Sequence, residues 1–199
     1  MLDRLSISNR IDQVIIATSI DKSDDAIEKF AHDYGCEVYR GSHNDVLDRY
    51  YQTARSLKTK PDFVVRLTAD CPLIDSSVID KIIESIQNTS LDFVSNSEPL
   101  PSSWPDGMDV SVMSYSALKK AWKIANKPSE REHVTFIFWK ENSNFKCKRV
   151  DCSKDLSKYR LTVDYEEDFL LIKKIISNFI NKNKDFRFIK MNEIIEELP

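Results

Sequence analysis

The chain has 199 residues, a formal net charge of −3 and only three glycines. This length fits one domain with a substantial core, and the weak negative charge gives no sign of a nucleic-acid binder. No apolar run approaches the ~20 residues that span a membrane, and the first residues, MLDRLSISNR, lack the apolar core of a signal peptide. We therefore expect a cytoplasmic protein with no nucleic-acid or membrane partner.

The four cysteines show no metal-binding spacing. They stand at Cys36, Cys71, Cys147 and Cys152 and form no CxxC pair. With only three scattered histidines in the chain, the spacing argues against a zinc site. We expect the cysteines to be reduced thiols.

Short apolar runs alternate with helical patterns through the first half of the chain. The run at 13–18 is apolar on both faces, as a buried parallel strand requires. Gly35 is placed to end the helix that follows it. By the same criteria, further strands are expected at 36–40 and 62–69. Helices are expected from a cap at 24 or 25 to Gly35, at 45–57 and from a cap at 76 or 77.

The alternation continues in the second half and predicts the fold class. Strands are expected at 91–95, 108–113, 145–150 and 160–163, helices at 116–125, 129–140, 165–180 and 191–198, and a proline-rich surface loop at 97–107. Strands that alternate with helices of this length favour an α/β fold with three layers. In such folds the functional groups gather at the carboxyl ends of the strands.

Two carboxylates stand at predicted strand ends. Asp70 ends VVRLTAD, and Asp164 ends RLTVD. If these strands are near neighbours, the two carboxylates converge, and Mg²⁺ prefers one or two carboxylates together with substrate phosphates. The alternative for each is a helix cap or a loop charge. For Glu166, Glu167 and Asp168, which follow Asp164, we favour the ordinary acidic first turn of a helix.

Basic residues also stand near strand ends. Arg40 and Arg66 have guanidinium groups that could hold phosphate or carboxylate, and the alternative is a surface salt bridge. Arg49 has an ordinary explanation in a helical i, i+4 pair with Asp45.

Two polar motifs are open to a structural or a functional interpretation. SEREHV contains Arg131, Glu132 and His133; it is either the lip of a substrate site or a helix start in which Ser129 and Glu132 form a capping box. WPDGMDV places Asp106 and Asp109 around Gly107, either as a substrate contact or as a hairpin turn.

Six motifs in order resemble one known family. They are ATS at 17–19, RGSHNDVLDRYYQTA at 40–54, VVRLTADCPLID at 64–75, WPDGMDV at 104–110, SEREHVT at 129–135 and LTVDYEEDF at 161–169. Together they resemble the cytidylyltransferase family of the spore coat polysaccharide biosynthesis protein F type. That family is similar to CMP-Kdo synthetase and acylneuraminate cytidylyltransferase. The resemblance runs from about residue 2 to the C-terminus.

The resemblance implies a Rossmann-like nucleotidyltransferase fold and a reaction between CTP and a sugar, expected to be acidic. The products would be pyrophosphate and a CMP-sugar for surface polysaccharide or glycan synthesis. The resemblance makes Asp70 and Asp164 the Mg²⁺ ligands, and we take Arg49 and Arg66 as the catalytic cations. It places Asp106, Gly107, Asp109, Arg131, Glu132 and His133 near the sugar or at the contact of a homodimer.

One departure from the family concerns the start of the chain. Family members open with a strand and a loop of the form R-x-G-S-x-R-L-P-x-K, whose N–H groups cradle the triphosphate, and this sequence begins after that loop. We therefore expect residues 1–199 to form a single N-terminally truncated cytidylyltransferase-like domain. Because the first strand is central in the order 3-2-1-4, the strands at 13–18 and 62–69 would lose their shared neighbour. Either they pair with each other or the chain is a fragment of a longer one.

Three functional hypotheses remain open at this stage. The first is an active CMP-sugar synthetase whose start lies upstream of Met1. The second is an inactive truncated remnant or a non-catalytic nucleotide-sugar binding protein, which predicts no pyrophosphate release by residues 1–199. The third is a glycosyltransferase, which is disfavoured because no D-x-D follows an apolar strand.

Overall fold

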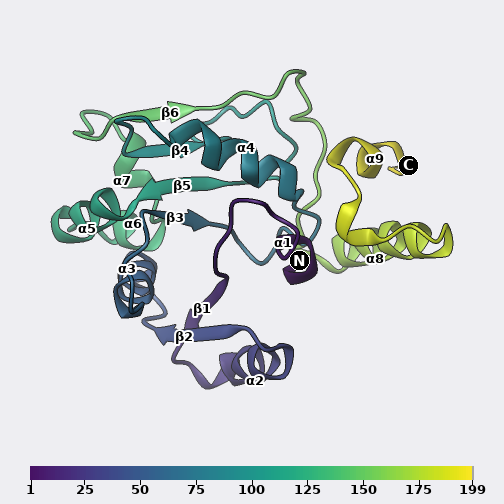
Figure 1. Cartoon of the computed structure of the whole chain (residues 1–199), viewed down its shortest axis with the longest axis horizontal. Coiled ribbons are helices and arrows are strands. Elements are labelled where there is room, and N and C mark those ends of the chain that lie inside the picture. The colour runs from purple at the N-terminus through teal and green to yellow at the C-terminus, as the bar shows by residue number, and fades with distance from the viewer. Residues whose placement is uncertain (199) are drawn as a thin grey trace.

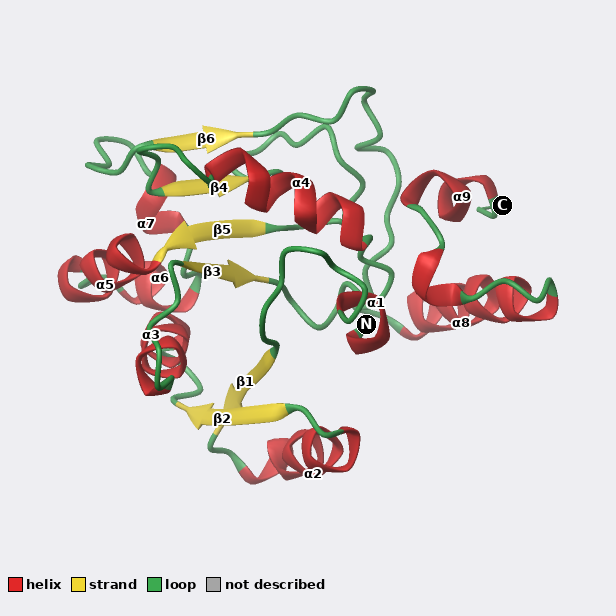
Figure 2. Ribbon diagram, viewed as in Figure 1, coloured by secondary structure: helices red, strands yellow, loops and turns green. Residues whose placement is uncertain are grey.

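The computed structural model describes residues 1–198 and shows a mixed α/β fold (Figures 1 and 2). Its strands are β1 (Ile15–Ser19), β2 (Glu37–Gly41), β3 (Phe63–Arg66), β4 (Phe93–Ser95), β5 (Ser111–Ser114) and β6 (Cys147–Arg149). They form a parallel β1–β2 pair and a separate sheet in the order β3-β5-β4-β6, in which β5 is antiparallel to β3 and β4. The antiparallel strand makes the larger sheet mixed.

Helices occupy most of the segments between the strands. They are α1 (Leu2–Leu5), α2 (Asp25–Tyr34), α3 (Val46–Ser56), α4 (Ser76–Ile86), α5 (Tyr115–Ile124), α6 (Pro128–Glu132), α7 (Phe136–Trp139), α8 (Glu166–Asn181) and α9 (Met191–Glu196), with 3₁₀ turns at Lys22–Asp24 and Phe186–Phe188. Gly35 ends α2 with φ of +80°, the left-handed cap that its position predicts. In Figure 1, α8 and α9 lie beyond the end of the sheet toward which β3 and β4 point.

Two hydrophobic cores lie on opposite faces of the larger sheet. Successive residues of a strand point to opposite faces. Val94 and Val112 pack with the isoleucines of α4, whereas Phe93 and Met113 pack with residues of α3, α5 and α7. The expected three layers are therefore present, with the sheet between α4 and the group of α3, α5 and α7.

Two expected elements take a different form. The segment 160–163 is no strand: it forms one isolated parallel bridge, between Arg160 and Asp106. The expected helix at 129–140 is broken into α6 and α7 at Val134, which has a φ of +42°. Its capping residue also differs, since Glu130 and not Glu132 accepts from the backbone N–H groups of Asn126 and Lys127.

The strands β1 and β3 do not pair with each other. Among residues 1–198, β1 pairs only with β2, and β3 only with β5. Residues of both strands line one cavity of about 700 Å³, together with Tyr50, Leu57 and Ile83. One expectation from the sequence was that β1 and β3 close the gap by pairing with each other. The structure shows no such pairing in the part of the chain that it describes.

A buried arginine joins the two ends of the chain. The side chain of Arg4 on α1 is 1 % exposed. It donates to the carbonyls of Ile74, Phe186 and Ile189 at 2.7, 2.6 and 2.7 Å. Burial lowers the pKa of Arg4, and the nearby Asp75 opposes this effect. Arg4 therefore holds α1 against the start of α4 and the segment before α9.

The four cysteines are free, as expected. Within residues 1–198 no helix is both long and apolar enough to cross a membrane.

We predict that Arg4→Met destabilises the protein by about 3 kcal/mol or more, because three carbonyls lose a partner and each buried unsatisfied group costs about 1–3 kcal/mol. Denaturant unfolding followed by circular dichroism measures this change. The matched control is Arg10→Met, which removes an exposed pair with Glu84 and is expected to cost less than about 1 kcal/mol. Equal effects of the two substitutions would contradict the role of Arg4.

We also predict that amides of β1 and β2 exchange with deuterium faster than those of β4 and β5. β1 and β2 pair only with each other and are largely half-exposed, whereas β4 and β5 are paired on both sides and mostly buried. Hydrogen exchange followed by mass spectrometry tests this, and equal protection of the two sheets would refute it.

Candidate functional site

Two segments far apart in the sequence meet beyond the carboxyl end of β3. The carbonyl of Asp70 accepts a hydrogen bond from the backbone N–H of Val163 at 2.8 Å. Asp164 is the next residue. The backbones that carry the two expected metal ligands therefore lie side by side.

The WPDGMDV turn joins the same place. Asp106 and Tyr159 share one backbone hydrogen bond, and the N–H of Leu161 donates to the carbonyl of Asp106 at 2.7 Å. Gly107 makes this approach feasible, because it has a φ of +100° and a Cβ atom there would lie 2.7 Å from the carbonyl carbon of Leu161. The glycine is needed for the contact, and the contact places Asp106 beside the segment that leads to Asp164.

Asp109 is the partly buried acid of this group. Its carboxylate accepts the N–H of Gly107 at 3.3 Å. Burial raises the pKa of Asp109, and the charges of Asp106 and Asp70 add to the increase, against the hydrogen bonds from Gly107 and the Ser97 hydroxyl. The charges of three carboxylates thus interact at one edge of the sheet, and a carboxyl group with a raised pKa, such as that of Asp109, is typical of functional sites.

Cys71 is next to these acids but takes no part as a nucleophile. It is buried, and its thiol lies 3.5 Å from the Asp70 carboxylate. Burial raises the pKa of the Cys71 thiol to about 12. The group is therefore protonated at neutral pH, which excludes thiolate chemistry.

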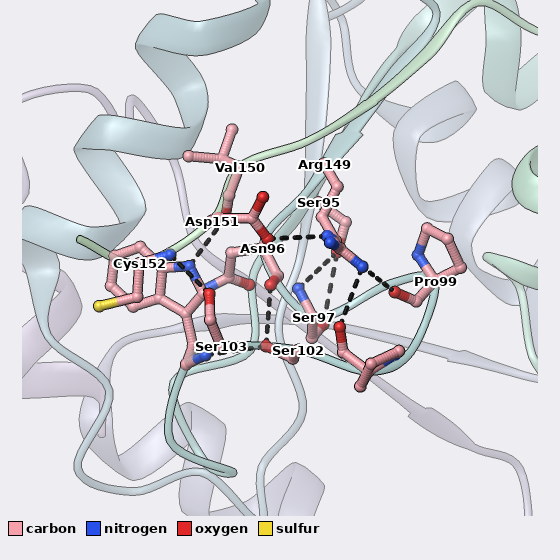
Figure 3. Close-up of polar contacts among 12 residues, drawn as sticks. Ser95, Asn96, Ser97, Pro99, Ser102, Ser103, Arg149, Val150, Asp151 and Cys152 are labelled. Carbon is pink, nitrogen blue, oxygen red and sulfur yellow. Dashed lines mark hydrogen bonds and ion pairs between the residues drawn. The ribbon is translucent and has the colours of Figure 1, made fainter. Parts of the chain in front are cut away.

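The loop 97–104 is held by polar contacts (Figure 3). Asn96 is fully buried and bonds to the carbonyl of Met108 and the N–H of Val110 at 2.6 and 2.7 Å. Arg149 donates to the carbonyls of Pro99 and Pro101 at 3.0 and 2.9 Å. These contacts hold the residue before the loop and the middle of the loop, and Ser97 lies between them.

We call the group of Asp70, Asp106, Asp109, Asp164 and Asp168 the acidic edge. Arg160 is the arginine that pairs with acids of this group. It pairs with Asp164, with Asp168 at 2.5 Å and with Asp106 at 3.6 Å. Asp168 also accepts the N–H groups of Asp164 and Tyr165. These N–H bonds and Arg160 lower the pKa of Asp168. Asp168 is thus an acid of the first turn of α8, as the sequence indicates, and it also caps the helix, while Asp164 carries an ion pair.

The carboxylates of Asp70 and Asp164 could supply part of the ligand shell of a magnesium ion, with the rest from the substrate and water. Within residues 1–198, no three His, Cys, Asp or Glu side chains are placed to enclose a metal ion. Mg²⁺ needs only one or two carboxylates, and substrate phosphates and water supply the remaining ligands. Asp70 and Asp164 match that requirement by chemistry and by the adjacency of their backbones, and their joint binding of Mg²⁺ stays a prediction.

Among the residues that the structure describes, Arg49 and Arg66 form no ion pair. The Nε atoms of both are buried without a hydrogen-bond partner. The helical pair between Arg49 and Asp45 is not formed, because Asp45 binds Arg131 on α6 instead. Arg40, in contrast, pairs with Asp25 and Glu28 at 2.7 and 2.8 Å, as a surface salt bridge does.

The SEREHV motif is not part of the acidic edge. Arg131 binds Asp45 and the carbonyl of Trp122, so it joins α6 to α3 and α5. Glu132 and His133 are exposed. The sugar or dimer contact expected for these three residues remains a prediction.

Three contributors to the site were absent from the expectations: Arg160, Asn96 and Arg149. Arg160 is the first residue of the RLTVD motif. Its spacing of four residues from Asp164 could have predicted their ion pair. Asn96 and Arg149 act through backbone carbonyls of a loop, and nothing in their sequence positions indicates such partners.

Comparisons with known proteins agree with this architecture. The family model described as cytidylyltransferase matches residues 1–194. An uncharacterised protein of Methanocaldococcus jannaschii is 35 % identical over 95 % of this chain and 76 % of its own length. The spore coat polysaccharide biosynthesis protein SpsF of Bacillus subtilis is 28 % identical over 82 % of this chain and 67 % of its own length.

Solved structures give the same result. A cytidylyltransferase from Leptospira borgpetersenii superposes with a TM-score of 0.88 at 33 % identity, over 98 % of this chain and 79 % of that one. A CMP:2-keto-3-deoxy-manno-octonic acid synthetase complexed with CTP has a TM-score of 0.62 at 10 % identity, over 88 % and 85 % of the two chains. The second likeness shows the fold alone. The Rossmann-like nucleotidyltransferase fold expected from the motifs is confirmed, and the chain belongs to the cytidylyltransferase family.

Proposed function

We propose that this site belongs to a CTP-dependent cytidylyltransferase that converts a sugar to a CMP-sugar. The observation that carries the proposal is the hydrogen bond between Val163 and Asp70, which joins two acid-bearing segments beside Asp106 and Asp109. Family membership supports the cytidylyl donor. SpsF, a relative of this chain, is named for polysaccharide biosynthesis, and this supports a sugar acceptor.

The reaction requires little covalent chemistry from the protein. A sugar hydroxyl oxygen forms a bond to the α-phosphorus of CTP, the bond from that phosphorus to the pyrophosphate oxygen breaks, and the hydroxyl proton leaves to water or a carboxylate. Catalysis then consists of positioning and charge stabilisation. A magnesium ion held by Asp70 and Asp164 would neutralise phosphate charge. The Asp109 carboxyl and the Ser97 hydroxyl would orient sugar hydroxyls.

A second candidate is a protein that binds the nucleotide without turning it over. The glycine content favours it, because the three glycines, at 35, 41 and 107, do not cluster in one loop that could hold phosphates.

One experiment separates these candidates. We expect residues 1–199 to bind CTP more tightly than ATP, GTP or UTP, as measured by isothermal titration calorimetry. Pyrophosphate release is then followed with Mg²⁺, CTP and a panel of acidic and neutral sugars, among which we expect an acidic sugar to serve. Release establishes the transferase, and CTP binding without release establishes the second candidate. Failure to bind CTP contradicts both.

We predict that Asp70→Asn weakens Mg²⁺ binding by about tenfold or more, because one of the two proposed ligands loses its charge. Calorimetric titration with Mg²⁺ alone measures this effect, and thermal unfolding shows whether the variant folds. The matched control is Asp33→Asn, an exposed acid on α2, which should leave Mg²⁺ binding unchanged. Unaltered Mg²⁺ binding by Asp70→Asn would remove Asp70 from the metal site.

A further prediction concerns the stability of the site against pH. The pKa of Asp109 is raised in the folded protein, so ionisation of Asp109 destabilises the fold as the pH rises from its unfolded pKa through its folded pKa. Asp109→Asn lacks this effect and should be at least as stable as the parent chain at pH 7. The advantage should shrink as the pH falls below the folded pKa, which thermal unfolding at several pH values measures. An advantage that grows toward low pH would contradict the raised pKa.

A further inference from the structure

Arg160 contacts more carboxylates than any other arginine within residues 1–198. Its guanidinium group uses a different nitrogen for each of three acids: Nη1 contacts Asp168 at 2.5 Å, Nη2 contacts Asp164, and Nε lies 3.6 Å from Asp106. The other arginines with carboxylate partners have one or two. Loss of one acid therefore leaves Arg160 with two partners.

The position of Arg160 does not depend on its contact with Asp164. Its backbone forms the parallel bridge with Asp106, and the N–H of the next residue, Leu161, donates to the carbonyl of Asp106 at 2.7 Å. The guanidinium carbon lies 5.8 Å from the centre of the Tyr165 ring, within the range of a cation–π contact. The guanidinium group would therefore stay at the acidic edge if its contact with Asp164 were broken.

The two short contacts of Arg160 differ in how firmly they are held. The side chain of Asp168 is 17 % exposed, and its second oxygen accepts the N–H groups of Asp164 and Tyr165 at 3.0 and 2.9 Å. The side chain of Asp164 is 51 % exposed. An ion pair in contact with water contributes little to stability. The contact with Asp164 is thus the one that a competing cation can replace more easily.

Asp164 is also close to the other proposed metal ligand. It follows Val163, whose N–H donates to the carbonyl of Asp70 at 2.8 Å. A divalent cation shared by Asp70 and Asp164 must therefore bind the same carboxylate that Nη2 of Arg160 contacts. Mg²⁺ carries two charges and prefers carboxylate oxygens, and two cations close together repel each other. Arg160 and the metal ion therefore compete for Asp164.

We propose that Arg160 is a stand-in for the divalent cation: it pairs with Asp164 while the metal is absent and leaves this carboxylate when the metal binds. The identity of the metal as Mg²⁺ rests on the proposed function, whereas the competition follows from the contacts of Arg160. Arg160 is in this sense a positioning residue, which holds Asp164 at the acidic edge before the metal arrives. One consequence is that Arg160 lowers the affinity of the site for free Mg²⁺.

The test is calorimetric titration with magnesium chloride alone, at an ionic strength of about 0.15 M, where distant charges are screened. We expect Arg160→Met to bind Mg²⁺ about fivefold or more tightly than the parent chain, because the competing partner and its repulsive charge are both removed. The matched control is Lys158→Met, which removes one positive charge from the same segment. Lys158 is exposed and lies 4.9 Å from the centre of the Tyr159 ring, and its substitution should alter Mg²⁺ affinity less than about twofold.

A cycle of double variants shows whether the gain in affinity depends on Asp164. In the Asp164→Asn background, Arg160→Met should change Mg²⁺ affinity less than about twofold, because the carboxylate for which the two cations compete is lost. A merely structural role of Arg160 predicts that Arg160→Met weakens Mg²⁺ binding, since the acidic edge would lose its shared partner. A general effect of net charge predicts the same gain in both backgrounds and in Lys158→Met.

NMR of the arginine side chains gives a second readout, which needs no variant of Arg160. The guanidinium N–H resonances of Arg160 should shift on addition of Mg²⁺ to the parent chain and stay in place in Asp164→Asn. Thermal unfolding shows whether each variant folds, and Arg160→Gln replaces Arg160→Met if the latter does not.

Four results would overturn the proposal: no Mg²⁺ binding by the parent chain, equal or weaker binding by Arg160→Met, the same gain in Lys158→Met, or Arg160 resonances that Mg²⁺ does not move. Competition between Mg²⁺ and Arg160 without CTP turnover leaves the proposal standing. Because the test contains neither CTP nor sugar, its failure is distinct from failure of the transferase assignment.

Discussion

The site depends on the close approach of Gly107 to the backbone of Leu161. No residue with a Cβ atom fits there without displacing the Leu161 carbonyl group. The approach allows the single bridge between Asp106 and Arg160. From this bridge the chain runs directly to Val163, whose N–H reaches the segment after β3. One backbone contact thus sets the position of acids contributed by three distant parts of the chain, although these residues form no regular strand.

The fold shows where local sequence patterns are sufficient and where they are not. The alternation of strands and helices was predictable because apolar periodicity reports burial, and Gly35 ends α2 as its position predicts. The predicted strand 160–163 failed because its hydrogen bonds go to a loop and not to a strand. The predicted helix 129–140 failed because Val134, a β-branched residue, takes a left-handed conformation that no local propensity favours.

Some site residues could likewise be predicted from local sequence, and others could not. Asp70 could be singled out because it follows β3, and acids at strand ends lie at one edge of an α/β sheet. Asp164 was singled out from an expected strand that does not form, and its backbone lies beside Asp70 through the hydrogen bond of Val163. The state of Arg49 could not be predicted, because Asp45, its neighbour one helical turn away, is bound by a residue 86 positions distant. Arg131 thereby takes the partner that the helical spacing assigns to Arg49. A long-range ion pair thus leaves Arg49 unpaired, and only the tertiary structure reveals it.

The acidic edge also limits how a divalent cation can bind there. Asp164 is not a free ligand, because Arg160 already pairs with it. Arg160 has two further carboxylate partners, Asp168 and Asp106, and can keep both when it releases Asp164. A cation that binds Asp164 therefore exchanges one ion pair for another without leaving the arginine uncompensated. The three-way pairing of Arg160 makes Asp164 available to a metal at a smaller electrostatic cost than a simple pair would.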